Sequence, residues 1–332
     1  MSKAESEFDL IRLYFAPLAE GAPGAFGLLD DAALIPEAAY IVTKDLMVEG
    51  VHFLADDPLD LTARKLIRVN LSDLAAKGAR PVGYFLGCVW PSDAEPADIE
   101  LFAKGLAADQ EQFRLHLFGG DTTRHKDGKA PLTLSATFFG APARSGFLHR
   151  KGAALGDDLY VTGTIGDAGL GLAALKKAAR FDAPDKDYLV ARCRLPEPRL
   201  VFGGALPGLA SAAIDISDGL LADAGHLAAL AGLAAEIDAA AIPLSAAAAR
   251  WLERTPDKSS AYGRIATAGD DYEILFAADK TRRRAVEMAA KVSKTPVARI
   301  GSITRGEGAL LKAPDGSRIP VRSSGFDHFS RR

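Results

Sequence analysis

The chain contains little cysteine, and this scarcity excludes two common kinds of structural site. Cys88 and Cys193 are the only cysteines among its 332 residues. Two cysteines are too few for a disulfide framework or for a cysteine-rich zinc site. The sequence therefore does not describe a disulfide-stapled scaffold or a zinc module.

Long apolar runs are also absent. The longest stretch without a formal charge is residues 200–214, and it is interrupted by glycine and proline. A membrane-spanning helix needs about 20 mostly apolar residues. The first nine residues include acidic side chains where a signal peptide carries a basic region and an apolar core. We therefore expect no membrane segment and a cytoplasmic location.

Neither sign of charge dominates. Forty basic residues stand against 43 acidic ones, which gives a net charge of −3. This balance argues against a surface that attracts nucleic acid or anionic lipid as a whole. Hydrophobic residues make up 48% and charged residues 25%, as in an ordinary globular protein. At roughly 150 residues per domain, the length predicts two domains.

Four familiar catalytic or nucleotide-binding signatures are missing. The sequence has no Gly-x4-Gly-Lys-Ser/Thr run, and the glycines of residues 163–171 do not fit Gly-x-Gly-x-x-Gly. It also lacks Gly-x-Ser-x-Gly and His-Glu-x-x-His, so serine hydrolases and zinc proteases lose support.

Extended and helical patterns alternate along the chain without a fixed repeat. Runs of β-branched and aromatic residues predict strands at 40–43, 82–90, 132–139, 158–162, 213–216, 272–277 and 297–303. Helical spacing predicts helices at 61–76, 99–113, 168–179, 220–230 and 283–292, while 239–250 is ambiguous between loop and helix. The pattern breaks near Arg150. We therefore expect two mixed α/β domains, 1–150 and 151–332.

Aspartates recur where apolar runs end. They are Asp30, Asp31, Asp45, Asp121, Asp215 and Asp218, and Asp73 lies three residues from Asn70 on one helix face. Two carboxylates about 4 Å apart repel by roughly 4 kcal/mol at an effective dielectric constant near 20. If several converge on one cleft, that cleft requires cations. Oxygen ligands favour Mg²⁺, which shares its remaining positions with phosphate oxygens. Convergence would therefore indicate a magnesium–nucleotide site.

Each of these residues also has a simpler interpretation. Asp218 is suited to cap the helix that follows, and aspartates beside glycine often form turns. Asn70 and Asp73 fit a solvated helix stripe, and His52 fits a packed histidine. The glycine-rich residues 163–171 suit either phosphate binding at a helix N-terminus or a tight turn with close helix packing.

Nine motifs in order along the chain carry a resemblance to a known family. They are EFDLI (7–11), DDAA (30–33), DLMVEGVHF (45–53), NLSDLAAKGA (70–79), GGDTT (119–123), VTGTIGD (161–167), IDISDGL (214–220), DDYEIL (270–275) and GFDHF (325–329). With these motifs the sequence resembles the thiamine-monophosphate kinase family, within the aminoimidazole ribonucleotide synthetase-like superfamily. The resemblance covers nearly the whole chain.

The resemblance implies a two-domain α/β fold. The N-terminal domain would bind ATP and Mg²⁺ and form a homodimer through its sheet, and the C-terminal domain would complete the nucleotide and substrate site. The implied reaction is the ATP-dependent conversion of thiamine monophosphate to thiamine diphosphate. Neither nucleic acid nor a membrane is implied as a partner.

The resemblance also assigns residues to roles. Positions that match the family's metal site are Asp31, Thr43, Lys44, Asp45, Asp73, Asp121, Asp215 and Asp218. Positions that match its nucleotide contacts are Gly120, Asp121, Arg150 and Ser217. Positions that match its thiamine phosphate site are His52, Asp270 and Phe326. Three residues depart from the family pattern: Leu29 replaces a glycine, Lys44 replaces the threonine that usually precedes the aspartate, and Asp270 replaces a glutamate.

Two alternatives remain beside this reading. One is another ATP-using enzyme of the superfamily, although selenophosphate synthetase and the hydrogenase maturation relative carry a reactive cysteine near one chain end, where this sequence has none. The other is a catalytically silent nucleotide-binding regulator, which only Leu29 and Lys44 favour.

The implied chemistry needs no catalytic general base. The acceptor is already a phosphate, which is anionic near neutral pH and ready to act as a nucleophile. The remaining task is to bring two polyanions together and stabilise the charge on the transferred group. We therefore expect metal-assisted, direct in-line transfer without a phosphoenzyme.

Overall fold

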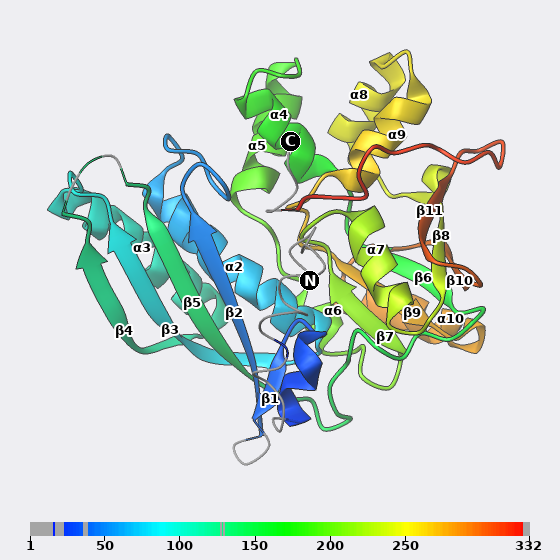
Figure 1. Cartoon of the computed structure of the whole chain (residues 1–332), viewed down its shortest axis with the longest axis horizontal. Helices are drawn as coiled ribbons and strands as arrows, with labels where there is room; N and C mark the ends of the chain where they lie inside the picture. The colour runs from blue at the N-terminus through cyan, green and yellow to red at the C-terminus, as the bar shows by residue number, and fades with distance from the viewer. Residues whose placement is uncertain (1–15, 17–22, 36–38, 127, 129, 328–332) are drawn as a thin grey trace, which may run out of the picture.

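The computed structural model describes residues 16, 23–35, 39–126, 128 and 130–327. The motif at residues 7–11 and the last two residues of the motif at 325–329 lie outside this part of the chain. Within it, two β-sheets form the centres of two domains, which stand side by side in Figure 1.

The first sheet has five strands in the order β1-β2-β5-β3-β4. Only β3 and β4 run parallel, and the other neighbours are antiparallel. The strands are β1 (Ala33–Ile35), β2 (Tyr40–Val48), β3 (Arg80–Trp90), β4 (His116–Arg124) and β5 (Thr133–Ala141), preceded by the short helix η3 (Pro23–Leu28).

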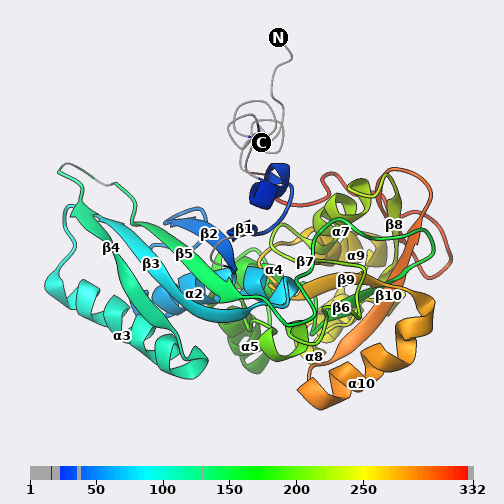
Figure 2. The same ribbon diagram turned by 90° about the horizontal axis from the view of Figure 1, so that it is seen from below.

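Two long helices cover one face of this sheet and leave the other face without a helical layer (Figure 2). Helix α2 (Leu59–Ala76) is buried along most of its length and contacts β2, β3 and β5. Helix α3 (Pro96–Phe113) begins with a capping box formed by Glu95 and Asp98 and packs against α2.

The second sheet has six strands in the order β11-β8-β10-β6-β9-β7. It is also mixed, because β11 runs parallel to β8 and the other neighbours are antiparallel. Its strands are β6 (Asp158–Thr162), β7 (Ala212–Asp215), β8 (Ala234–Asp238), β9 (Ile274–Ala278), β10 (Val297–Thr304) and β11 (Gly308–Lys312). The helices are α4 (Asp167–Leu175), α5 (Ala183–Arg194), α6 (Leu200–Gly203), α7 (Leu220–Ala229), α8 (Ala246–Arg254), α9 (Lys258–Thr267) and α10 (Arg283–Ser293), with the short turns η4 (Ala239–Ala241) and η5 (Lys280–Arg282).

Both faces of the second sheet are covered. Helices α7 and α9 share one hydrophobic cluster with it, and α6 and α10 share another. The second cluster also contains Ala75 and Ala76, so the C-terminal end of α2 packs into the second domain. Helix α2 is thus the element that joins the two domains, and it carries side chains to the cleft between them.

The expected two-domain mixed α/β fold is confirmed. The expected boundary at Arg150 stays a prediction, and it falls between the last strand of the first sheet and the first strand of the second. The ambiguous residues 239–250 divide into the turn η4 and the start of α8. Among the residues that the structure describes, no helix has the length and apolar composition that a membrane span requires.

Candidate active site

Three aspartates from distant parts of the sequence meet between the domains. Asp31 follows η3, Asp73 lies on α2 and Asp215 is the last residue of β7. One carboxylate oxygen from each lies within 4.8 Å of the others. The structure therefore brings together three of the aspartates that the sequence suggests could converge. We call these three residues the acid cluster.

Two cations already sit against this cluster. Lys77, fully buried at the C-terminal end of α2, forms ion pairs with Asp30 and Asp31. Arg150 pairs with Asp31 on the other side. Burial alone would raise the pKa of Asp31, but Arg150 and Lys77 outweigh it and hold that pKa below its usual value. Asp31 is therefore an ionised carboxylate in the folded protein.

The remaining carboxylates are compensated less. Burial, and then the charge of Asp31, raises the pKa of Asp215 to about 7, because the lowering by Arg150 and Lys77 is smaller. Burial together with Asp215 and Asp45 raises the pKa of Asp73 well above its usual value. The Thr43 hydroxyl on β2 donates to Asp73 Oδ2 at 2.5 Å and lies 3.1 Å from the Asp31 carbonyl oxygen.

Asp45 on β2 extends the acidic region. Its carboxylate is buried, and Oδ2 has no hydrogen-bond partner among the described residues. Burial, followed by the charges of Asp215 and Asp31, raises its pKa to about 7. A buried carboxylate oxygen without a partner is costly unless a cation or donor completes it. These all-oxygen side chains therefore fit a hard divalent cation such as Mg²⁺.

Lys44 does not point toward the acid cluster. It alternates with Thr43 and Asp45 along β2, so its side chain projects to the opposite face of the sheet. There it is exposed and contacts the Ser135 hydroxyl on β5. The charged end of Lys44 therefore does not enter the cluster.

Gly120 and Asp121 lie apart from the other predicted residues. Both are on β4, which is separated from β2 by β5 and β3. At about 4.8 Å per strand, Asp121 is roughly 14 Å from the β2 residues. Gly120 is required locally, because an added Cβ would come within 1.9 Å of the Leu86 carbonyl oxygen. A second, mainly apolar cavity of about 380 Å³ opens between these residues and α3.

A cleft of about 420 Å³ continues from Asp45 along the domain interface. Side chains from both domains line it. Six of the predicted site residues are among them: Asp45, His52, Ser217, Asp218, Asp270 and Phe326. All three predicted acceptor-site residues thus share one cleft with two predicted metal ligands.

His52 and Phe326 are held in position by backbone contacts. The Val48 N–H donates to His52 Nδ1 at 3.0 Å, so in the neutral ring Nε2 carries the proton and acts as a donor. The Phe326 N–H donates to the Asp218 carbonyl oxygen at 2.9 Å, which ties the C-terminal segment to the loop after β7. Phe326 remains 39% exposed.

The loop after β7 is organised by Asp223, which sequence reasoning did not single out. Its Oδ2 accepts the backbone N–H groups of Ser217, Asp218 and Gly219 at 3.1–3.2 Å. Asp218 and His226 lie close enough to Asp223 to form a second potential ligand group. Asp218 therefore lies in the loop that follows Asp215, but its side chain belongs to a different group from the acid cluster.

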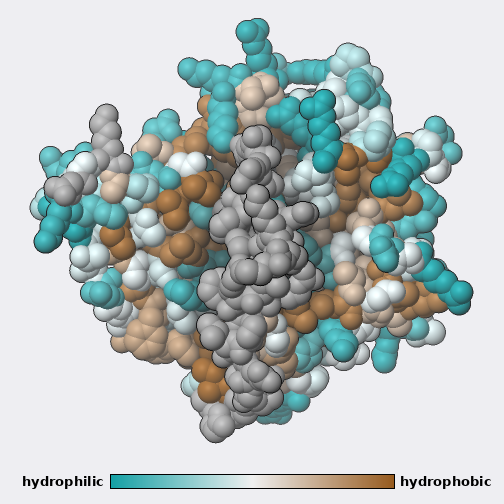
Figure 3. Space-filling view, viewed as in Figure 1, coloured by the Kyte–Doolittle hydropathy of each residue, from teal (hydrophilic) through white to brown (hydrophobic). Residues whose placement is uncertain are grey.

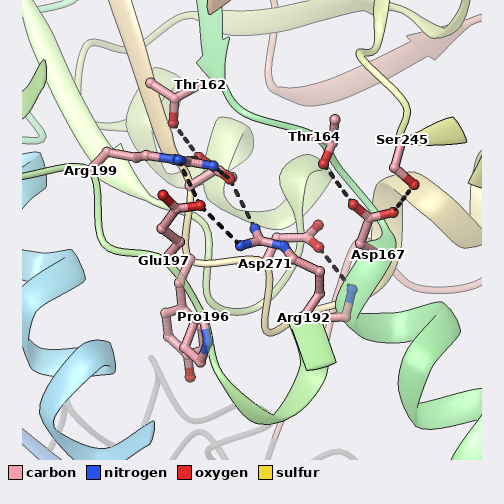
Figure 4. A network of polar contacts seen from close by, with 12 residues as sticks. Thr162, Thr164, Asp167, Arg192, Pro196, Glu197, Arg199, Ser245 and Asp271 are labelled. Carbon is pink, nitrogen blue, oxygen red and sulfur yellow. Dashed lines mark hydrogen bonds and ion pairs between the residues drawn. The ribbon is translucent and has the colours of Figure 1, made fainter. Parts of the chain in front are cut away.

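The glycine-rich residues 163–171 surround a protein carboxylate. The N–H groups of Gly166 and Ala168, at the start of α4, donate to Asp271, which Figure 4 shows beside Arg192. An added Cβ at Gly163 would come within 2.0 Å of Glu273 Oε1. The structure thus favours close packing over phosphate binding for this turn.

The fold and the acidic cleft define an AIR synthase related protein. The family model for the N-terminal domain of AIR synthase related proteins matches residues 29–141, and the model for the C-terminal domain matches residues 155–312. The solved structure of AaThiL complexed with AMPPCP and TMP has a TM-score of 0.83, with 30% identity over 99% of both chains.

Two relatives show to which family within this class the chain belongs. The thiamine-monophosphate kinase of Caulobacter vibrioides is 45% identical over 91% of this chain and 85% of its own length. That of Escherichia coli K12 is 38% identical over 98% of both chains. The chain therefore belongs to the thiamine-monophosphate kinase family, as the sequence motifs predicted.

Proposed function

We propose that this chain transfers the γ-phosphoryl group of ATP to the phosphate of thiamine monophosphate, giving thiamine diphosphate and ADP. The observation that carries the proposal is the position of Asp45. It borders the acid cluster and lines the cleft that contains His52, Asp270 and Phe326. A metal-bound phosphate and an acceptor in the cleft would therefore meet at this residue.

The acid cluster supports a role for Mg²⁺. Asp31, Asp73 and Asp215, with Asp45 and Thr43 beside them, offer oxygen ligands in a buried setting. Bound there, Mg²⁺ would neutralise the carboxylates and stabilise negative charge on the transferred group. The predicted roles of Lys44 through its carbonyl, of Asp218 and of Asp121 remain part of this proposal.

The cleft supports the acceptor assignment. Phe326 presents an aromatic ring to a cationic thiazolium, the His52 Nε2–H is a hydrogen-bond donor suited to an acceptor oxygen, and Asp270 offers carboxylate oxygens to an amine. The chemistry needs no general base, because an oxygen of the acceptor phosphate is already a nucleophile. That oxygen bonds to the γ-phosphorus as the bond to the β–γ bridging oxygen breaks, and ADP leaves.

The placement of the predicted nucleotide contacts supports a homodimer. Arg150 and Ser217 belong to the interdomain cleft, whereas Gly120 and Asp121 lie across the first sheet on β4. One nucleotide would reach both groups if β4 of a second copy approached the cleft. The purine would then occupy the apolar cavity beside Gly120.

The open face of the first sheet suits such an interface. Apolar side chains are visible over this sheet, left of the grey residues in Figure 3. Tyr40, Phe85, Phe118 and Phe139 form a group of aromatic rings there, with Phe85 and Phe118 exposed. We propose that a second copy of the chain covers this face. Because ATP is a cytoplasmic metabolite, we further propose that the enzyme acts in the cytoplasm.

A single assay tests the proposed reaction. Purified protein with ATP and Mg²⁺ should release ADP when thiamine monophosphate is added, with an equal amount of thiamine diphosphate formed. ADP release that does not depend on the acceptor would contradict the proposal. With γ-labelled ATP and no acceptor, stoichiometric label on the protein would argue against direct transfer.

A further inference from the structure

We propose that Lys65 is a positioning residue for the acceptor. It is buried beneath the acceptor cleft and contacts one residue on each side of it, His52 in the first domain and Asp270 in the second. The inference rests on the proposed function, since that proposal assigns the cleft to thiamine monophosphate. Lys65 belongs to no motif that pointed to the site, and its expected contribution is to hold Asp270 and His52 at a fixed separation.

The contacts of Lys65 reach both domains. Its Nζ forms an ion pair with Asp270 Oδ2 at 2.8 Å and donates to the His52 carbonyl oxygen at 2.9 Å. The Lys65 side chain is 5% exposed, whereas Asp270 is 30% exposed and lines the cleft. Asp270 thus has one face toward the acceptor and the other toward a buried ammonium group.

The position of Lys65 on α2 makes this connection rigid. Helix α2 is long and buried, and Val69, one turn after Lys65, itself lines the cleft. Burial alone would lower the pKa of Lys65, but the charge and hydrogen bond of Asp270, together with Cys193 and Asp57, outweigh it and raise that pKa. The ammonium group therefore stays protonated while it holds the carboxylate.

The segment that carries Asp270 adopts a conformation that needs external support. Asp270 and Tyr272 have φ angles of 71° and 50°, in the left-handed region that ordinary residues rarely occupy. The alternate residues are fixed from the second domain: Asp271 by the start of α4, and Glu273 by Arg192 and Arg199.

On the cleft side, the charged contact to Asp270 comes from Lys65, together with a 3.3 Å hydrogen bond from the Tyr272 hydroxyl. Lys65 is the charged contact between this segment and the first domain, beside the Ser72 hydroxyl, which donates to the Tyr272 carbonyl oxygen at 3.4 Å. Removing it would leave Asp270 in place covalently but free to change its orientation relative to His52.

The test compares Lys65→Met with a matched variant, Arg64→Met. Arg64 is the preceding residue of α2 and also forms an ion pair at 2.8 Å, with Asp109, away from the cleft. Lys65→Met should raise the KM for thiamine monophosphate by about tenfold or more, the effect of losing a charged hydrogen bond. The KM for ATP should change little. Arg64→Met should alter neither constant, and Lys65→Arg should recover part of the loss.

A double-mutant cycle tests whether Lys65 acts through Asp270. In an Asp270→Asn background, Lys65→Met should add clearly less than it does alone. Fully additive effects, an unchanged acceptor KM in Lys65→Met, or an equal rise in the KM for ATP would overturn the proposal.

A substrate-free measurement separates this inference from the proposed function. The Asp270 and Tyr272 N–H groups donate to the Ser217 and Ile216 carbonyl oxygens. Their hydrogen exchange should be faster in Lys65→Met than in the wild type or Arg64→Met. If the wild type does not phosphorylate thiamine monophosphate, the proposed function fails, while unchanged exchange in Lys65→Met would refute the positioning role of Lys65.

Discussion

Replacing Asp45 with asparagine should stabilise the metal-free protein while abolishing its turnover. The Asp45 carboxylate is buried, Oδ2 has no partner among the described residues, and its pKa rises to about 7 from 3.8. Above that pH the carboxylate is ionised in the folded protein, where burial makes the charged form less stable than it is in water. Asparagine has nearly the same shape without the charge, so the folded state no longer bears this cost.

The size of the effect follows from the pKa shift. A carboxyl whose pKa is raised on folding binds its proton more tightly in the folded state, so stability is lost as pH rises from the unfolded pKa through the folded one. A shift from 3.8 to about 7 corresponds to a cost of up to about 4 kcal/mol at pH 8. At pH 5 the advantage of Asp45→Asn should fall to roughly two-fifths of this value, because the folded wild type then binds the proton.

The assay is urea unfolding in EDTA at pH 8 and pH 5, repeated with Mg²⁺ and a nonhydrolysable ATP analogue. We expect Asp45→Asn to exceed the wild type at pH 8 without metal, to gain much less from Mg²⁺, and to lose turnover by orders of magnitude. Asp187→Asn, an exposed change on α5, serves as the matched control and should do none of these. An Asp45→Asn protein no more stable than wild type at pH 8, or equally stabilised by Mg²⁺, would refute the reasoning.

Four further outcomes are expected. Phe326→Ala should raise the KM for thiamine monophosphate about tenfold, the upper range for a cation on an aromatic ring, with little change for ATP; steady-state kinetics would expose a misplaced acceptor pocket if ATP were affected instead. Unphosphorylated thiamine should be phosphorylated far more slowly than its monophosphate, because the proposed transfer uses no general base to deprotonate its hydroxyl, and equal rates would contradict this. Gly163→Ala should lower the melting temperature markedly, since its φ is +59° and the new Cβ would meet Glu273; a normal melting temperature would show that the turn can relax. Phe118→Arg, on the exposed sheet face, should convert a dimer to a monomer in sedimentation experiments, and an unchanged mass would place the interface elsewhere.

Elements with strong periodicity could be predicted closely from the sequence. The strand at 158–162 matches β6, and the helices expected at 61–76 and 283–292 match α2 and α10 within two residues. These segments are bounded by glycine, proline or charged residues that end regular structure. Local sequence therefore determines them with little help from tertiary contacts.

Strand β4 was missed for a physical reason. Most of its residues are exposed at the edge of the first sheet, and they include the polar run Asp121–Arg124. Such a segment has no buried face, so no alternation marks it as a strand. Its extended conformation depends on pairing with β3, whose hydrogen-bonding edge is not visible in the sequence.

The candidate site likewise contains residues that could be predicted from the sequence and contacts that could not. The aspartates that meet in the acid cluster were recognisable because they follow apolar runs and helix-face positions. The pairing of their compensating cations was not, because Lys77 and Arg150, the latter expected only as a nucleotide contact, meet Asp31 only in the folded chain. Lys65 and Asp270 are 205 positions apart, and no local pattern links them. The direction of Lys44, by contrast, follows from simple alternation along β2.

The regular spacing of side chains on α2 has a consequence for which acceptors fit. Lys65, Val69, Asp73 and Lys77 follow one another at intervals of four residues along one side of the helix. With a rise of 1.5 Å per residue, Lys65 and Asp73 are about 12 Å apart along the axis. On the proposed assignment of the cleft, the interval between its ring-binding end and the carboxylates is thus set by a rigid helix, which loops at the surface cannot adjust. The fixed distance therefore selects acceptors by their length. A molecule with the same rings and a shorter arm would fill the cleft and leave its phosphate out of reach of the acidic end.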